Sequence, residues 1–202
     1  AKKRTSAFEF RGEDGVTMEF WLKVPSVAAG IQKTILQVTG TTAPQQLANT
    51  TGEILLYQYR KELRLTVKSG SVSYTPIFSN MLTAGEWNHY AISLKYDSGN
   101  LISKCYKNGQ LSHQDEAAKN IQNILPARHG LNASIGSGSL TVQSTGFLTG
   151  SIDELRYWKK ERTSEQIFNN WFVHIGGGTN DFDSNVDLGC YLKFNEGITG
   201  NT

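Results

Sequence analysis

The sequence is poor in the residues that mark several large classes of protein. It has two cysteines and four prolines in 202 residues, and its net charge is only +2. Two cysteines cannot form the network of bridges that holds a disulfide-rich domain together; Cys105 and Cys190 either form one bridge or stay as thiols. A net charge this small gives no electrostatic reason to expect nucleic acid as a partner. No apolar run reaches the length of about 18 residues that a membrane span needs, so we expect no membrane insertion.

Sequence motifs of common catalytic and metal centres are also missing. There is no H-E-x-x-H and no closely spaced group of Cys and His, which argues against zinc. The nearest match to a serine nucleophile elbow, NASIG at 132–136, lacks its first glycine. The acidic segment 181–187 alternates Asp and Asn like a calcium loop, but it has Val186 and Leu192 where that loop needs Gly and Glu. We therefore predict no catalytic residue and a solvated loop at 181–187.

Alternation of apolar with polar or small residues dominates the rest of the chain. Residues 16–24 (VTMEFWLKV) alternate in this way, which is typical of a strand with one buried face. Residues 54–59 and 63–67 flank a short polar turn and predict a hairpin. Asn108-Gly109 predicts a second hairpin, because a type I′ turn needs positive φ at both central residues. Strands at this spacing favour a β-sandwich.

One short helix is predicted near the C-terminal end. Thr163 can cap it and Gln166 can complete a capping box. Ile167, Phe168 and Trp171 then fall on one face of the helix, which we expect to pack against the sandwich.

Four segments, taken in order, resemble the laminin G-like domains of the concanavalin A-like lectin and glucanase superfamily. They are VTMEFWLKV (16–24), GEWNHYAISLKYD (85–97), CYKNGQL (105–111) and GFLTGSIDELRYWKKERTSEQI (146–167). The resemblance implies an all-β jelly-roll sandwich of two antiparallel sheets with one short helix on the C-terminal side. We expect residues 1–202 to form a single such domain. The first residue is Ala1, and YLKFNEG (191–197) is similar to a motif that often opens such domains, so we expect a piece of a larger modular protein.

The closing segment GSIDELRYW contains two adjacent acids, Asp153 and Glu154. Neighbouring side chains of a regular strand point to opposite faces, so we expect the two acids to be separated and unable to act on one bond. Glucanases of this superfamily use an E-x-D strand motif, and that motif does not occur in this chain. The resemblance therefore favours a domain without catalytic activity, and a polysaccharide-active enzyme is the less favoured alternative.

Calcium is the one cofactor that the resemblance suggests. In several branches of the superfamily the acid that corresponds to Asp153 helps to hold a structural calcium ion. Glu13 and Asp14 could add oxygen ligands if the first long strand lies beside the closing strand. Arg11 offers the alternative, because it could pair with Asp153 or Glu154 and satisfy the acid without a metal.

Six residues are candidates for contacts with a ligand. Tyrosines on the middle strands could let a sugar stack on a sheet face, and a polar loop could supply donors and acceptors at the rim. The candidates are Tyr57, Tyr59, Tyr74, Arg128, His129 and Asn132.

Together these features predict a binding or adhesion module that recognises a glycan or a protein surface. We expect it to work beside neighbouring domains of a parent chain, in an extracellular, cell-surface or virion-associated protein. A structural domain that only assembles a particle or fibre is the main alternative.

Overall fold

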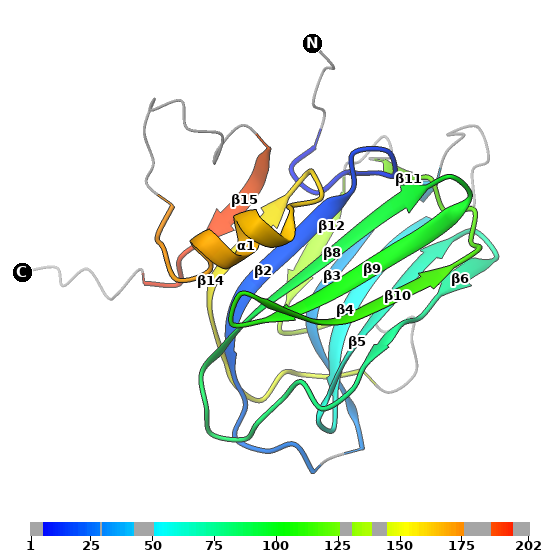
Figure 1. The fold of residues 1–202 in the computed structure, drawn as a ribbon. Coiled ribbons are helices and arrows are strands. Elements are labelled where there is room, and N and C mark those ends of the chain that lie inside the picture. The colour runs from blue at the N-terminus through cyan, green and yellow to red at the C-terminus, as the bar shows by residue number, and fades with distance from the viewer. Residues whose placement is uncertain are drawn as a thin grey trace, which may run out of the picture.

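The computed structural model of the chain describes residues 6–28, 30–42, 51–125, 131–138, 145–175 and 187–195, and shows two sheets packed face to face (Figure 1). The nine-stranded sheet contains β1 (Phe10–Arg11), β3 (Gln32–Thr42), β4 (Thr51–Tyr59), β5 (Glu62–Ser69), β6 (Val72–Tyr74), β7 (Ile77–Phe78), β11 (Asn123–Leu125), β12 (Asn132–Ile135) and β13 (Thr145–Gly146). The six-stranded sheet contains β2 (Val16–Lys23), β8 (Asn88–Asp97), β9 (Asn100–Lys107), β10 (Gln110–Ala117), β14 (Ser151–Trp158) and β15 (Leu188–Leu192). The helix is α1 (Ser164–Asn170).

The strand order confirms the predicted sandwich. The six-stranded sheet runs β10-β9-β8-β2-β14-β15, and the main path of the other sheet runs β1-β11-β3-β4-β5-β6. All strand pairs in both sheets are antiparallel except the two-residue β13, which pairs with β3 in parallel. No helix among the described residues is long and apolar enough to cross a membrane.

Both predicted hairpins are confirmed. β4 and β5 meet at a short turn where Arg60 has φ 55°. β9 and β10 meet at Asn108 and Gly109, with φ 48° and 81°, as a type I′ turn requires. The Asn108 side chain accepts a bond from the backbone N–H of His89 at 2.9 Å, which ties this turn to β8.

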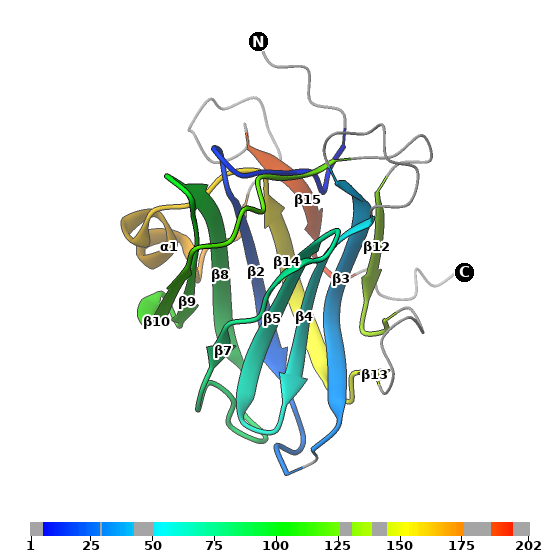
Figure 2. The same ribbon diagram turned by 90° about the vertical axis from the view of Figure 1, so that its right-hand side faces the viewer.

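The core lies between the sheets, and α1 covers the outer face of the six-stranded sheet (Figure 2). Met18 and Phe20 of β2 belong to this core. Thr17 and Glu19 point the other way and are also fully buried, with 0% and 1% exposure. The expected strand with one buried face is therefore buried on both, because a second layer of chain lies over it.

The predicted capping box of α1 is present. Gln166 N–H donates to the Thr163 hydroxyl at 3.1 Å, and Thr163 N–H donates to the Gln166 side chain at 3.0 Å. Ile167 is fully buried against Ala91 and Tyr106, as predicted. Phe168 was expected on the same face but is 54% exposed, because seven helical residues bury only a narrow stripe.

Candidate functional site

The closing strand β14 carries a β-bulge. Glu154 and Leu155 together oppose the single residue Phe20 of β2, and Glu154 has φ 52°. The extra residue shifts the alternation by one position. Ile152 and Leu155, three residues apart, therefore both pack on the core.

The bulge overturns the expectation that Asp153 and Glu154 face opposite sides. Asp153 pairs with Trp21, and Arg156 pairs with Glu19, so both lie on the outer face of the six-stranded sheet. Glu154 bonds to Arg156 at 3.1 Å and lies on that face too. The Asp153 carboxylate accepts a bond from the Glu154 backbone N–H at 2.9 Å.

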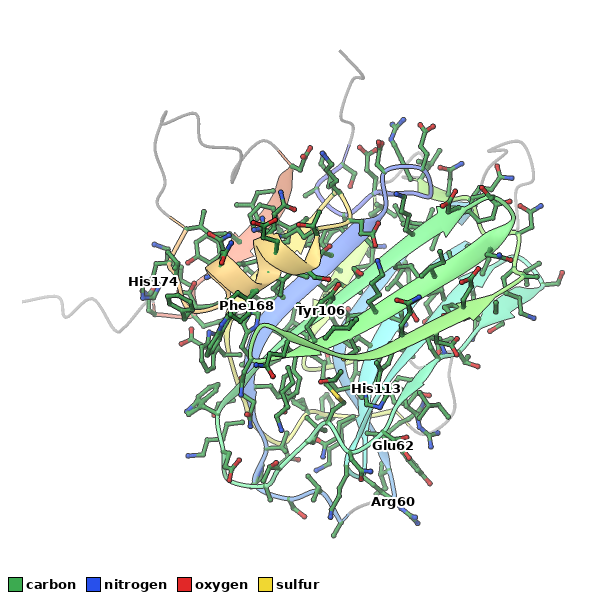
Figure 3. The ribbon with its side chains drawn as sticks, in the orientation of Figure 1. Arg60, Glu62, Tyr106, His113, Phe168 and His174 are labelled. Atoms are coloured by element: carbon green, nitrogen blue, oxygen red, sulfur yellow. The ribbon has the colours of Figure 1, made fainter. Side chains whose placement is uncertain are left out.

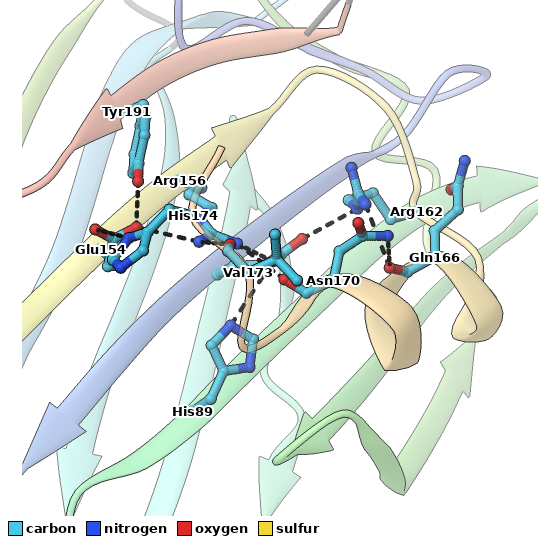
Figure 4. A network of polar contacts seen from close by, with 10 residues as sticks. His89, Glu154, Arg156, Arg162, Gln166, Asn170, Val173, His174 and Tyr191 are labelled. Atoms are coloured by element: carbon cyan, nitrogen blue, oxygen red, sulfur yellow. Dashed lines mark hydrogen bonds and ion pairs between the residues drawn. The ribbon is translucent and has the colours of Figure 1, made fainter. Parts of the chain in front are cut away.

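Glu154 is held by three side chains (Figure 4). Arg156 Nη2 lies 3.1 Å from Oε2, and the Tyr191 hydroxyl donates to the same oxygen. His174 Nδ1 lies 3.1 Å from Oε1. Burial acts to raise the pKa of Glu154, but the bonds from Tyr191, Arg156 and His174 outweigh it and hold the pKa below its ordinary value. Glu154 is therefore a stable carboxylate and not a proton donor near neutral pH.

A second buried carboxylate, Glu19, lies beneath the helix with 1% exposure. Arg162 Nε is 3.2 Å from it, Arg156 Nη1 is 3.6 Å away and His89 Nε2 is 3.7 Å away. A carboxylate removed from water is costly unless cations compensate its charge, and the two arginines supply that charge here. Neither oxygen of Glu19 has a hydrogen-bond partner among the described residues, so the compensation is by ion pairing.

The same arginines bind the backbone of α1 and of the segment after it. Arg156 donates to the carbonyl of Asn170 at 3.3 Å and to that of Val173 at 2.6 Å. Arg162 donates to the carbonyl of Gln166 at 3.3 Å. These carbonyls include groups at the end of the helix that have no partner within it. The charges of the sheet therefore hold α1 in place.

Aromatic side chains close the cluster from the side. The Trp171 ring packs against those of Trp21 and His89, with centroids 5.6 and 6.0 Å apart. The Tyr106 hydroxyl is 3.0 Å from that of Ser164. A pocket of about 110 Å³ lies beside Arg156 and Arg162 and is also lined by Trp158 and His174. The buried members of the cluster, Glu19, Arg156 and Arg162, leave little side-chain surface for a ligand and hold α1 on the sheet.

The residues predicted for calcium do not meet. β2 does lie beside β14, which is the condition on which that prediction depended, but the two strands are antiparallel. Glu13 and Asp14 precede β2 and lie by the far end of β14, where Asp14 O accepts from Glu161 N at 2.8 Å. Asp153 pairs with Trp21, five positions along from Val16, roughly 17 Å away.

Calcium ligands lie 2.3–2.6 Å from the ion, so these three residues cannot share one. No group of three His, Cys, Asp or Glu suited to a metal occurs among the described residues. Calcium stays an untested prediction that these donors do not support. The alternative pair with Arg11 is not formed either, because Arg11 Nη2 bonds to Glu9 at 3.3 Å. Arg156 takes that role for Glu154.

Two of the predicted ligand residues lie together on the outer face of the nine-stranded sheet. Leu56 faces the core. Tyr57, next to it, and Tyr59, two positions further along β4, therefore share the outward face. Tyr57 is 6% exposed and Tyr59 is half-buried. The Arg64 guanidinium lies 4.1 Å from the centre of the Tyr59 ring, and Glu62 bonds to Arg64 at 2.7 Å.

The end of this face carries an exposed rim that the sequence analysis missed. Arg60 follows Tyr59, and both lie beside Gly30, where an added Cβ would be 3.5 Å from Arg60 Nε and 3.6 Å from Tyr59 Oη. Ile31 and Phe147 are 55% and 81% exposed. Parallel pairing of β13 with β3 places Gly146, which precedes Phe147, beside Ile31, whose Cγ2 would lie 3.4 Å from a Cβ added there. This end of the sandwich lies away from His174 and Phe168 (Figure 3).

The remaining candidates are scattered. Tyr74 lies in the core at 3% exposure, where its hydroxyl contacts Ser103 at 2.7 Å, so neither face of its ring is free for a sugar. Asn132 is exposed on β12. Arg128 and His129, like the acidic segment up to residue 186, lie outside the described residues.

The two cysteines are free thiols. Cys105 lies on β9 and Cys190 on β15, four strand spacings apart in one sheet, or about 19 Å. A disulfide needs Cα atoms within about 7 Å, so the sandwich itself prevents the bridge.

Comparisons with known proteins agree with this fold. A family model of the concanavalin A-like lectin/glucanases superfamily matches residues 3–168. No curated protein sequence is significantly similar to the chain.

Solved structures resemble the chain at low sequence identity. A candidate carbohydrate-binding protein from Bacteroides ovatus has a TM-score of 0.58 and 18% identity over 89% of this chain and 45% of its own. The CBM40 domain of a Ruminococcus gnavus sialidase, bound to α2,3-sialyllactose, has a TM-score of 0.56 and 16% identity over 82% of this chain and 98% of its own. Domains LG4-5 of mouse laminin α1 have a TM-score of 0.52 and 11% identity over 74% of this chain and 38% of their own. The chain thus spans less than half of two of these three, and the likeness shows the fold alone.

Proposed function

The chain belongs to the concanavalin A-like lectin/glucanases superfamily, and on that premise we propose that it is a non-catalytic binding module that recognises a glycan. The observation that carries the proposal is the half-exposed Tyr59, flanked by Arg60 and Arg64 on the outer face of the nine-stranded sheet. The Arg64 guanidinium covers one part of the ring, so the part left exposed would contact the apolar side of a sugar. The guanidinium groups would offer the donors that Glu62 leaves free to hydroxyls or a carboxylate.

Similar structures support this reading. The CBM40 domain to which the chain is similar is bound to sialyllactose, a carbohydrate with a carboxylate. The exposed Ile31 and Phe147 extend the surface beside Tyr59 and could contact the apolar parts of a larger ligand.

The state of the carboxylates favours binding without catalysis. Glu154 at the bulge and Glu19 on the neighbouring strand are both ion-paired with buried arginines. A retaining glycosidase would need two carboxyl groups about 5 Å apart that both reach the sugar. Release of reducing sugars from a panel of polysaccharides would contradict this part of the proposal.

We further propose that the module belongs to a larger extracellular, cell-surface or virion-associated protein. The proteins that resemble it include a laminin module and carbohydrate-binding domains. Fractionation of the source cells or particles, with detection by an antibody against this domain, measures the location directly.

The test of the binding site is a glycan array followed by calorimetric titration. Tyr59→Ala should weaken binding of the best glycan by up to about tenfold, because an aromatic contact of this kind contributes about 0.5–1.5 kcal/mol. Phe168→Ala is the matched control, since it removes an exposed aromatic ring from the other side of the molecule.

Equal binding by both variants would place the glycan elsewhere. A folded wild-type protein that binds no glycan on the array would instead favour a protein ligand or the assembly role.

A further inference from the structure

A second groove opens between the free edges of the two sheets, apart from the Tyr59 surface. Its volume is about 470 Å³, within the range of small-ligand sites. One wall is formed by residues 73–77, around β6 and β7 of the nine-stranded sheet, and includes Ile77, which is 49% exposed. The other wall is formed by Asp115 and Ala117 of β10 and by Lys119. Strand β10 ends the six-stranded sheet, and no described strand pairs with its outer side (Figure 1).

The pattern of backbone hydrogen bonds between the strands shows which N–H and C=O groups of β10 have no described partner strand. His89 O accepts from Asn108 N, so alternate residues of β8, beginning with His89, direct their backbone groups toward β9. When this alternation is followed from β8 through β9 to β10, the backbone groups of Ser103 and its partner Asp115 bond to each other. Gln114 and Glu116 then direct their N–H and C=O groups away from β9, to the open side.

The side chains of β10 alternate between the face of the sheet toward the groove and the opposite face. Asp115 pairs with the fully buried Ser103 and shares its face, which is the face toward the groove. Asp115 itself is exposed, and no ion pair joins its carboxylate among the described residues. A strand added at this edge would direct every second side chain into the groove, beside Asp115 and Ile77.

We propose that this edge binds an extended peptide segment of a partner protein, as an additional strand beside β10, with a lysine or arginine in the groove. The open backbone groups of Gln114 and Glu116 give main-chain pairing. The exposed carboxylate of Asp115 gives the charge preference, and Ile77 gives an apolar wall for the stem of the basic side chain. Asp115 lies on β10 itself, opposite the added strand, whereas Lys119, the other charged residue of the groove, follows the end of β10. Charged residues on an edge normally discourage pairing between like edges, and here the carboxylate of Asp115 would favour a basic residue opposite it over an acidic one.

Two labelled peptides test the proposal by fluorescence anisotropy: SVTVKVTS, and SVTVEVTS with glutamate in place of lysine. The wild-type protein should bind the lysine peptide about tenfold or more tightly than the glutamate peptide. Asp115→Lys should reverse this preference, because the charge that faces the groove changes sign.

Gln114→Pro tests the main-chain pairing. The Gln114 N–H points away from β9, so proline removes a group needed by the added strand and leaves the β9–β10 ladder intact. This variant should lose binding of the lysine peptide, and Gln114→Thr, which keeps the N–H, should retain it. Melting temperatures confirm that each variant is folded.

Any one of three results would overturn the proposal. The two peptides could bind equally, neither could bind at millimolar concentration, or Asp115→Lys and Gln114→Pro could both bind as the wild type does. Tyr59→Ala should leave peptide binding unchanged, so failure here is separate from failure of the glycan site.

Discussion

Replacing Glu19 by Gln tests whether charge compensation holds the helix on the sheet. The substitution keeps the shape of the side chain and removes only its charge. Glu154 still compensates Arg156 in the variant, but Arg162, which is 8% exposed, loses the carboxylate 3.2 Å from its Nε. A buried cation without its partner is the costly outcome of breaking a buried pair.

The expected loss follows from the burial of the cluster. Breaking a buried ion pair on one side costs about 3–5 kcal/mol. The Gln side chain keeps the shape of Glu and leaves Arg156 paired with Glu154, so we expect the lower end, about 3 kcal/mol. For a domain of this size about 1 kcal/mol shifts the melting temperature by about 2–4 °C, which gives a decrease of about 6–12 °C.

Urea unfolding followed by circular dichroism measures the free energy of unfolding. Glu62→Gln is the matched control, because Glu62 pairs with Arg64 at 2.6 Å but at 27% exposure, where a pair contributes less than about 1 kcal/mol. Adding Arg162→Met to Glu19→Gln should recover part of the loss, since it removes the unpaired cation. A Glu19→Gln loss as small as that of Glu62→Gln would refute the reasoning.

Two further predictions concern Glu154 and the β9–β10 turn. The folded pKa of Glu154 is held below 4.5, so its contribution to stability is present above about pH 4.5 and is lost as the pH falls through the folded pKa. Urea unfolding from pH 7 to pH 2.5 should show the difference in free energy of unfolding between wild type and Glu154→Gln becoming smaller in acid. A constant difference would contradict this. Gly109→Ala should cost at least about 1 kcal/mol, because φ is 81° and the new Cβ would lie 2.4 Å from Trp171 Cδ1; Gly99→Ala, at φ 95° with nothing within 4 Å, is the control for strain alone, and equal losses would exclude the Trp171 contact.

Local features of the fold could be predicted from the sequence. The Asn108-Gly109 turn and the Thr163–Gln166 capping box both depend on residues within four positions of each other. The strand alternation is equally local, and four ordered segments were enough to recognise the superfamily that the family model matches.

The candidate sites could be predicted only in part. Tyr59 of β4 and Tyr74 of β6 are the same residue type in one sheet, but Tyr74 turns into the core and Tyr59 turns outward. The open edge of β10 and the rim at Ile31 and Phe147 depend on which strands become neighbours, and no residue pattern marked them.

The segment GSIDELRYW separates what can be predicted from local sequence from what depends on contacts with distant segments. By itself it determined a closing strand with two acids, since alternation and propensity act within a few residues. The register with β2 then placed a bulge at Glu154 and both acids on one face. Only the tertiary structure brought Tyr191 and His174 to Glu154 and closed α1 over Glu19. Backbone preferences are local, whereas burial and ion pairing depend on segments that are distant in sequence until the sheets assemble.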